Sequence, residues 1–147
     1  LRYAIIGDMN EDKLHELEKL FQKDRYVALS GIRIEEVGDD YATVGAAVRP
    51  DEHMNGVGTV QGGMLYTAAD FAFAVLTNML HPTTVTQTVT YIRAAKTDRI
   101  SATARELACS GHNCVVEVTV RDGEGVTVMT GLFNGFISVK KNNTGSR

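Results

Sequence analysis

Apolar residues near the start of the chain recur at the spacing of one helical face. Asn10 can accept a hydrogen bond at the start of such a helix, which we predict to run to about Arg25. The apolar stripe that would pack against the rest of the protein consists of Leu14, Leu17, Leu20 and Phe21.

Short runs that alternate between apolar and polar residues follow this helix. The first two, Ile32–Val37 and Tyr41–Val48, are separated by Gly38-Asp39-Asp40, which is typical of a hairpin turn. Closely spaced turn signals between the later runs favour antiparallel pairing over crossover helices. Those later strand-like runs are Val85–Arg93, Arg99–Ala108, Cys114–Arg121 and Val126–Val139.

The most helical apolar segment of the chain is Met64–Leu80, which follows a glycine-rich stretch and ends at His81-Pro82. Apolar residues occupy most of its faces, which indicates burial on most sides. The sequence therefore predicts an α+β fold, in which a mostly antiparallel sheet packs on one buried helix supplied between its second and third strands.

Length and charge narrow the function classes. A chain of 147 residues fits one domain, and a net charge of -3 with a pI near 5.8 lacks the basic surface that nucleic acid requires. No apolar run approaches the roughly 18 residues of a membrane span, and the first residues do not resemble a secretion signal. We expect a cytoplasmic protein, with no membrane partner, in which Cys109 and Cys114 are free thiols.

Asp70 is the only acidic residue between Met64 and Leu80. A buried carboxylate is costly unless it has partners, faces a cleft or takes part in chemistry. The alternative is a hydrogen-bonded aspartate at a seam between subunits. Gly62-Gly63 precedes the helix and could let a substrate approach the free N–H groups of the first turn, where the helix dipole favours negative charge. Glycine there could also mark only a tight entry into the helix.

The spacing of these two features constrains how they could cooperate. Gly62 and Asp70 are eight residues apart, about 12 Å along a helix, whereas both groups must lie within roughly 3 Å of one reacting centre. Two antiparallel copies of the helix would place the start of one beside the middle of the other. A catalytic role for Asp70 therefore requires a dimer.

Two stretches carry a resemblance to a known family. The segment Asn55-Gly56-Val57-Gly58-Thr59-Val60-Gln61-Gly62-Gly63 and the following helix with Asp70 resemble the motif N-G-x-G-T-x-H-G-G and L-A-D-x-A-F-A of PaaI-like hotdog thioesterases. The later Tyr91-Ile92-Arg93-Ala94-Ala95-Lys96 is similar to that family's aromatic-x-R-P-A-K strand end. The order of elements agrees from about Gly31 to Val139.

The resemblance implies a hotdog fold, in which a five- or six-stranded antiparallel sheet wraps around a long central helix, here with an extra N-terminal helix. We accordingly divide the chain into an N-terminal helical extension (1–28), a hotdog domain (29–140) and a polar tail (141–147). The resemblance also implies homodimers whose sheets join, often paired again into homotetramers. The implied activity is hydrolysis of acyl-CoA without a metal or cofactor.

The resemblance assigns roles to individual residues. Asp70 corresponds to the catalytic base or nucleophile, and the N–H of Gly62 or Gly63 to the group that polarises the thioester carbonyl. Asn55 corresponds to the residue that places the carbonyl or the attacking water, although an asparagine here could simply cap its own loop. Thr84 falls near a hydroxyl that related enzymes hold beside the carboxylate.

Basic side chains and one departure from the motif complete the candidate site. Arg93, Lys96 and His112 are candidate contacts for the phosphates of CoA, or else solvated surface residues. The family's histidine before Gly-Gly is Gln61 here, which can form hydrogen bonds but carries no charge. This change keeps open an alternative, a non-catalytic acyl-CoA binding or sensor module.

Other chemistries find less support in the sequence. A hotdog hydratase would need a histidine near position 75, which is Val75. No cluster of histidine, cysteine and carboxylate residues has the spacing of metal ligands.

Overall fold

The computed structural model describes residues 11–77 and 82–138. Its helices are α1 (Glu11–Phe21), α2 (Arg25–Ser30), α3 (Pro50–His53) and α4 (Gly62–Thr77). Its strands are β1 (Arg33–Val37), β2 (Tyr41–Ala47), β3 (Pro82–Tyr91), β4 (Arg99–Ser110), β5 (Asn113–Asp122) and β6 (Thr127–Ile137). None of the helices in these ranges has both the length and the apolar character needed to cross a lipid bilayer.

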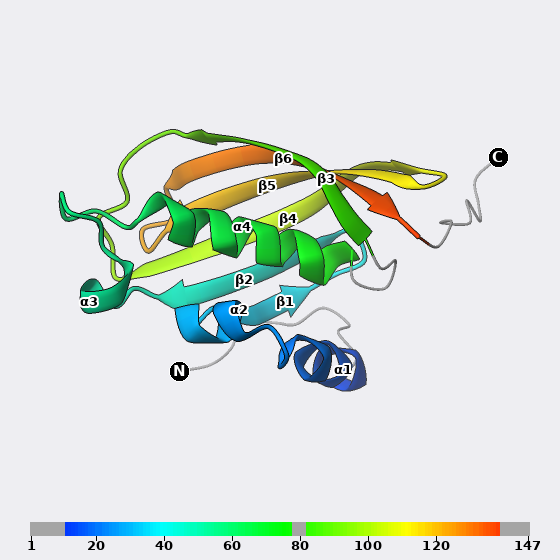
Figure 1. The fold of residues 1–147 in the computed structure, drawn as a ribbon, viewed down its shortest axis with the longest axis horizontal. Helices are drawn as coiled ribbons and strands as arrows, with labels where there is room; N and C mark the ends of the chain where they lie inside the picture. The colour runs from blue at the N-terminus through cyan, green and yellow to red at the C-terminus, as the bar shows by residue number, and fades with distance from the viewer. Residues whose placement is uncertain (1–10, 78–81, 139–147) are drawn as a thin grey trace.

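The described strands form one six-stranded sheet in the order β1-β2-β4-β5-β6-β3, and every neighbouring pair is antiparallel. Helix α4 connects β2 to β3 and lies against one face of the sheet, while α1 and α2 lie beside the β1 edge (Figure 1). The predicted α+β architecture, with one helix supplied between the second and third strands, is confirmed.

The core lies between α4 and the face of the sheet that it covers. Alternate residues of β5 point toward α4, since Val116, Val118 and Val120 are fully buried while the residues between them are more exposed. From the helix, the ring of Phe73 packs 5.8 Å from that of Phe133 on β6. Burial of each such side chain contributes about 1.5 to 3 kcal/mol, so this face fixes α4 on the sheet.

The predicted helix from Asn10 to Arg25 is wrong in one respect, because two helices occupy this region. The first ends at Phe21, and Asp24 starts the second, since its side chain accepts a hydrogen bond from the backbone N–H of Val27 at 3.0 Å. Helix α2 crosses the predicted domain boundary between residues 28 and 29. Leu17 of the predicted stripe is buried, whereas Leu20 is 48% exposed.

Other element boundaries differ from the prediction by a few residues. Strand β3 begins at Pro82 instead of Val85, with an irregularity in pairing between Thr84 and Thr86. The short helix α3 lies in a stretch that the sequence had indicated only as glycine-rich. The predicted ends at Leu80 and Val139 lie outside the described residues.

The prediction of free cysteines is also wrong, since Cys109 and Cys114 form a disulfide. They are directly opposite each other in the β4–β5 hairpin, with Cα atoms 4.1 Å apart. Sequence reasoning weighed only the general rarity of disulfides. It did not have the strand register, which places the two side chains on the same face of the hairpin.

Candidate active site

Asp70 lies midway along α4 and is half-buried. Its Oδ1 atom accepts a hydrogen bond from the side-chain amide of Gln87 on β3. The carboxylate is therefore neither freely solvated nor sealed in the core. Among the described residues it has one hydrogen-bond partner, and it remains partly accessible, as a reacting group must.

Tyr66 precedes Asp70 by one helical turn and was not among the predicted site residues. Burial, followed by the negative charge of Asp70, raises the pKa of the Tyr66 phenol above its usual value of 10. Its ring lies 6.1 Å from that of Phe133. Tyr66 is thus a neutral, partly buried hydroxyl beside the carboxylate at neutral pH.

At the start of α4, one backbone donor has no partner in the part of the chain that the structure describes. Gln61 precedes the helix, and its side-chain oxygen accepts a hydrogen bond from the N–H of Gly63. The N–H of Met64 donates to the Gln61 carbonyl at 2.9 Å. Within the described residues the N–H of Gly62 donates to no acceptor. Because it lies at the positive end of the helix dipole, this group can stabilise a developing oxyanion.

Strand β3 contacts the start of α4 as well as its middle. The Tyr91 hydroxyl donates to the Gly62 carbonyl at 3.1 Å, and the Tyr91 ring would lie 3.3 Å from a Cβ atom added to Gly62. Close packing of this ring therefore favours glycine at the helix start. Tyr91 thus binds the carbonyl of Gly62 and leaves its N–H free of any acceptor among the described residues.

One chain does not bring Gly62 and Asp70 to the same centre. Helix α4 runs without a break from Gly62 to Thr77, so the eight-residue separation corresponds to about 12 Å along its axis. The predicted spacing is therefore present in the folded chain. A reaction that uses both groups must draw one of them from a second copy.

Asn55 uses both ends of its amide to close its own loop. Its Oδ1 accepts from the backbone N–H groups of Val57 at 3.1 Å and Thr59 at 3.0 Å, and its Nδ2 donates to the Thr59 hydroxyl at 2.8 Å. This is the loop-capping arrangement that sequence reasoning kept as the alternative. In this structure Asn55 holds the segment that leads to Gln61.

The remaining candidate site residues lie in different parts of the structure. Thr84 is exposed on β3 opposite Gly135, and the residue of β3 that reaches Asp70 is Gln87. Arg93 and Lys96 are exposed on a segment that lies beside the start of α4, because the N–H of Val60 donates to the carbonyl of Ala95 at 2.8 Å. These two cations of one chain therefore lie near its own Gly62.

His112 lies at the other end of the sheet. Its ring stacks on that of Phe136 at 5.1 Å, and its Nδ1 is 2.7 Å from the Ile137 carbonyl. Phe136 pairs with Thr83 near the start of β3. Tyr91, the last paired residue of β3, lies eight residues or about 26 Å further along the strand, and Arg93 follows it. A single chain does not bring His112 together with Arg93 and Lys96.

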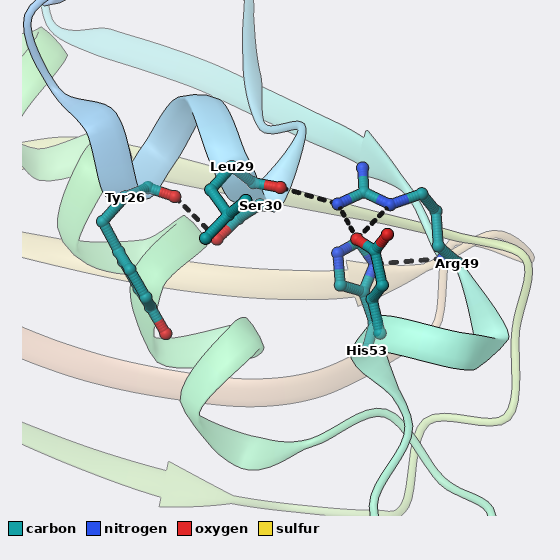
Figure 2. A network of polar contacts seen from close by, with 6 residues as sticks. Tyr26, Leu29, Ser30, Arg49 and His53 are labelled. Carbon is teal, nitrogen blue, oxygen red and sulfur yellow. Dashed lines mark hydrogen bonds and ion pairs between the residues drawn. The ribbon is translucent and has the colours of Figure 1, made fainter.

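A buried histidine of helix α3 holds the backbone at Gln61 in place. His53 is 5% exposed, and its Nδ1 accepts a hydrogen bond from the backbone N–H of Arg49 at 3.0 Å (Figure 2). Its carbonyl accepts from the N–H of Gln61 at 2.8 Å. The Arg49 side chain donates to the Glu52 carboxylate. It also donates to the carbonyl of Leu29, which ties α3 to α2 (Figure 2).

The protonation of His53 should make stability depend on pH. Burial, reinforced by the charge of Arg49, lowers the pKa of His53 below 6.5. The unfolded chain then takes up a proton at a higher pH than the folded chain. The contribution to stability is complete above about pH 6.5, the pKa of an unperturbed histidine, and is lost as pH falls toward the folded-state pKa.

Urea unfolding at a series of pH values between about 7.5 and 5 should therefore show a steeper fall in the free energy of unfolding for wild type than for His53→Asn. The amide that replaces the imidazole in this variant keeps an acceptor but does not titrate in this range. Parallel curves for the two proteins would contradict the assignment of this pH dependence to His53.

The described residues contain one grouping of potential metal ligands, formed by Glu106, Cys109 and Cys114, whose donor atoms lie within 4.8 Å of one another. The two sulfurs are bonded to each other, so the grouping offers no pair of thiolates while the disulfide is formed. It is also distinct from the surroundings of Asp70. Sequence spacing alone had not indicated this grouping.

A cavity of about 440 Å³ lies between α1, α2, β1 and one side of α4. The ring of Phe71 from α4 lines it, together with Phe21, whose ring packs edge-on at 5.0 Å. Arg33 and Glu18 contribute polar walls. None of the residues predicted to form the site lines this cavity, so it is separate from the site around Asp70.

The six-stranded antiparallel sheet around a long helix defines a hotdog fold, and solved structures share it. The PaaI protein of the phenylacetic acid degradation operon of E. coli has a TM-score of 0.81 and 20% identity, over 91% of this chain and 99% of that chain. A "hypothetical thioesterase protein" from Streptococcus pneumoniae, solved with coenzyme A, has a TM-score of 0.75 and 23% identity, over 85% of this chain and 99% of that chain. The predicted hotdog fold and its similarity to PaaI-like proteins are confirmed.

Sequence comparison places the chain in a family. The family model described as "Domain of unknown function (DUF4442)" matches residues 17–136, and the chain belongs to this family. A curated protein of Archaeoglobus fulgidus, named "Putative esterase", is 30% identical over 91 residues, which cover 60% of this chain and 58% of that protein. The chain thus spans less than two thirds of the length of that relative.

Proposed function

We propose that this protein hydrolyses the thioester of an acyl-CoA to a free acid and CoA. The observation that carries the proposal is the half-buried carboxylate of Asp70 on the same apolar helix as the N–H of Gly62, which donates to no acceptor among the described residues. Such a carboxylate supplies a base or nucleophile, and such an N–H supplies an oxyanion donor. The names of the PaaI, thioesterase and esterase relatives support the same class of reaction.

In the proposed reaction the Gly62 N–H donates to the thioester oxygen as negative charge develops there. With Asp70 as general base, its carboxylate takes a proton from water while the water oxygen bonds to the thioester carbon. The carbon–sulfur bond then breaks, and the CoA sulfur leaves with the proton. With Asp70 as nucleophile, its oxygen bonds to the thioester carbon and the carbon–sulfur bond breaks, which releases CoA as a thiolate and leaves a mixed anhydride. Water then hydrolyses the anhydride to the free acid and the Asp70 carboxylate, and a proton released in this step goes to the CoA sulfur.

The proposed site is shared between two copies of the chain. Strand β3 is ten residues long and forms one edge of the sheet, with the side chains of residues 83–86 exposed. A long edge strand is a template for pairing with another chain. Pairing along β3 would join two sheets into a homodimer and supply Gly62 from one copy and Asp70 from the other. Two such dimers would form the proposed homotetramer.

Acyl-CoA is the proposed substrate because cationic side chains lie near the proposed oxyanion donor. Arg93 and Lys96 are proposed to contact the CoA phosphates, with His112 as a further contact from another part of the assembly. Gly63, Thr84 and Asn55 complete the proposed surroundings of the thioester. The acyl group is proposed to be small, aryl or of medium length, and the reaction is proposed to need no cofactor, since CoA is part of the substrate.

A second candidate, a non-catalytic acyl-CoA binding or sensor module, is favoured by one observation. Gln61 replaces the motif's histidine, and its side-chain oxygen is occupied by the Gly63 N–H. A pocket that has lost a polarising histidine could retain binding without hydrolysis. This candidate differs from the first in a single measurable property, which is turnover.

Release of free thiol from a panel of acyl-CoA esters tests the proposal. The panel should contain short-chain, medium-chain and aryl thioesters at equal concentrations. We expect turnover of at least one class, and the ranking of kcat/KM identifies the acyl group. Failure to hydrolyse any member, combined with a rise in Tm when the same esters are added, would favour the binding module.

Replacement of Gln61 should have a moderate effect on this reaction. Gln61→Ala removes the acceptor of the Gly63 N–H, and we expect kcat/KM to fall by the equivalent of one hydrogen bond, about 0.5 to 1.5 kcal/mol. Gln61→His restores the motif and should be tolerated. Steady-state kinetics of the three proteins check this. A fall of more than about 100-fold in Gln61→Ala, or some 2.7 kcal/mol, would show that Gln61 takes part in the chemistry directly.

A further inference from the structure

The hydrogen bond between Gln87 and Asp70 joins the edge strand β3 to the central helix α4. Gln87 lies on the face of β3 that points toward α4, where it and Val89 are half-buried while Thr86, Thr88 and Thr90 are exposed. A glutamine on an otherwise apolar face needs a partner. Its amide donates to Oδ1 of Asp70.

This contact constrains the carboxylate. An ionised carboxylate only accepts hydrogen bonds, so it is the amide nitrogen of Gln87 that must face it. Among the described residues, no other side chain or backbone group donates to Asp70. One oxygen is thus fixed by the protein, and the other stays available to water or to the thioester. A charge-assisted bond of this kind limits rotation of the carboxylate.

The same strand also sets the position of the helix start, and the two contacts match in spacing. Gln87 and Tyr91 are four residues apart, about 13 Å along a strand. Asp70 and Gly62, which they contact, are eight residues apart, about 12 Å along a helix. Strand β3 therefore runs antiparallel to α4 with both contacts in register. A shift of β3 would disturb both at once.

We propose that Gln87 is a positioning residue, which holds the Asp70 carboxylate in its reactive orientation. This inference rests on the proposed thioesterase activity and extends it to a residue on the edge strand. Misplacement of a reacting group by about 1 Å can cost roughly 100-fold in rate. Removal of the amide should therefore affect the chemical step more than substrate binding.

Gln87→Met tests the inference, because methionine has a similar length and no hydrogen-bond donor. We expect kcat to fall by about 10- to 100-fold, with KM within about twofold and Tm close to wild type. Gln87→Glu keeps the shape of the side chain but replaces the donor by an acceptor, so its kcat should fall at least as far. Glu124→Gln is the control, since it changes an exposed side chain in the turn between β5 and β6, outside the proposed site and the proposed β3 interface, and should match wild type.

A double-mutant cycle separates positioning from an independent role. In an Asp70→Asn background, adding Gln87→Met should not lower the residual kcat further, since the group that Gln87 positions is already gone. An equal fractional loss in both backgrounds would overturn the inference. So would wild-type kcat in both Gln87 variants while Asp70→Asn is inactive, an outcome that would leave the proposed function intact.

Failure of the proposed function has a different outcome. If wild type hydrolyses no acyl-CoA at all, the proposed activity falls, and the positioning role falls with it.

Discussion

Asp70→Asn should lower kcat by at least about 100-fold, the usual cost of losing a general base or nucleophile. The substitution removes the charge and basicity of the carboxylate but keeps its shape. Asparagine can still meet the Gln87 side chain, so the fold and the affinity for acyl-CoA should change little. Thiol-release kinetics give kcat, and calorimetric titration of the acyl-CoA gives the binding constant.

Glu124→Gln is a matched control for Asp70→Asn. It removes a carboxylate in the same way, at an exposed position in the turn between β5 and β6, and should leave kcat unchanged. An Asp70→Asn protein within a few-fold of wild type would remove Asp70 from the catalytic role. Loss of binding together with turnover would instead indicate a structural role.

Two inactive proteins should regain activity when their chains are mixed. Gly62 is the first residue of α4 and its φ is not positive, so proline suits the backbone of this position, and its missing N–H deletes the proposed oxyanion donor. Its ring also adds a Cβ atom 3.3 Å from Tyr91, a contact that the control must reproduce. Loss of one such donor costs about 100- to 1,000-fold in kcat. Gly62→Ala is the control, because it adds a Cβ atom near Tyr91 but keeps the N–H, and it should retain most activity.

Mixing Gly62→Pro chains with Asp70→Asn chains then tests the shared site. Each heterodimer contains one site with both groups intact and one with neither. After subunit exchange at equal amounts, half of the dimers are heterodimers, so about a quarter of the wild-type activity should return. Activity that stays at the level of the parent proteins would contradict a site formed by two chains.

The features of the site that depend on one helix could be predicted from the sequence. Periodicity and the single acid within an apolar run located α4 and Asp70, and helix geometry gave the separation from Gly62. These inferences need only the rise and turn of a helix. The folded chain preserves them because α4 is continuous from Gly62 to Thr77.

Contacts between distant segments could not be predicted in the same way. The partner of Asp70 on β3, Gln87, depends on how the edge strand lies along α4, although a glutamine between Val85 and Val89 on alternating positions is a visible signal. The Cys109–Cys114 bridge depends on the register of β4 and β5. Register is set by the packing of the whole sheet. A local sequence pattern carries no information about that packing.

The most direct test of the proposed function is the product balance of a prolonged reaction with the preferred acyl-CoA. Mass spectrometry should find one free acid and one CoA for each ester consumed, over many turnovers of the wild-type chain. Asp70→Asn should form neither at a comparable rate. Intact acyl-CoA after incubation with wild-type protein, under conditions in which the ester binds and raises Tm, would contradict the thioesterase and leave the binding module.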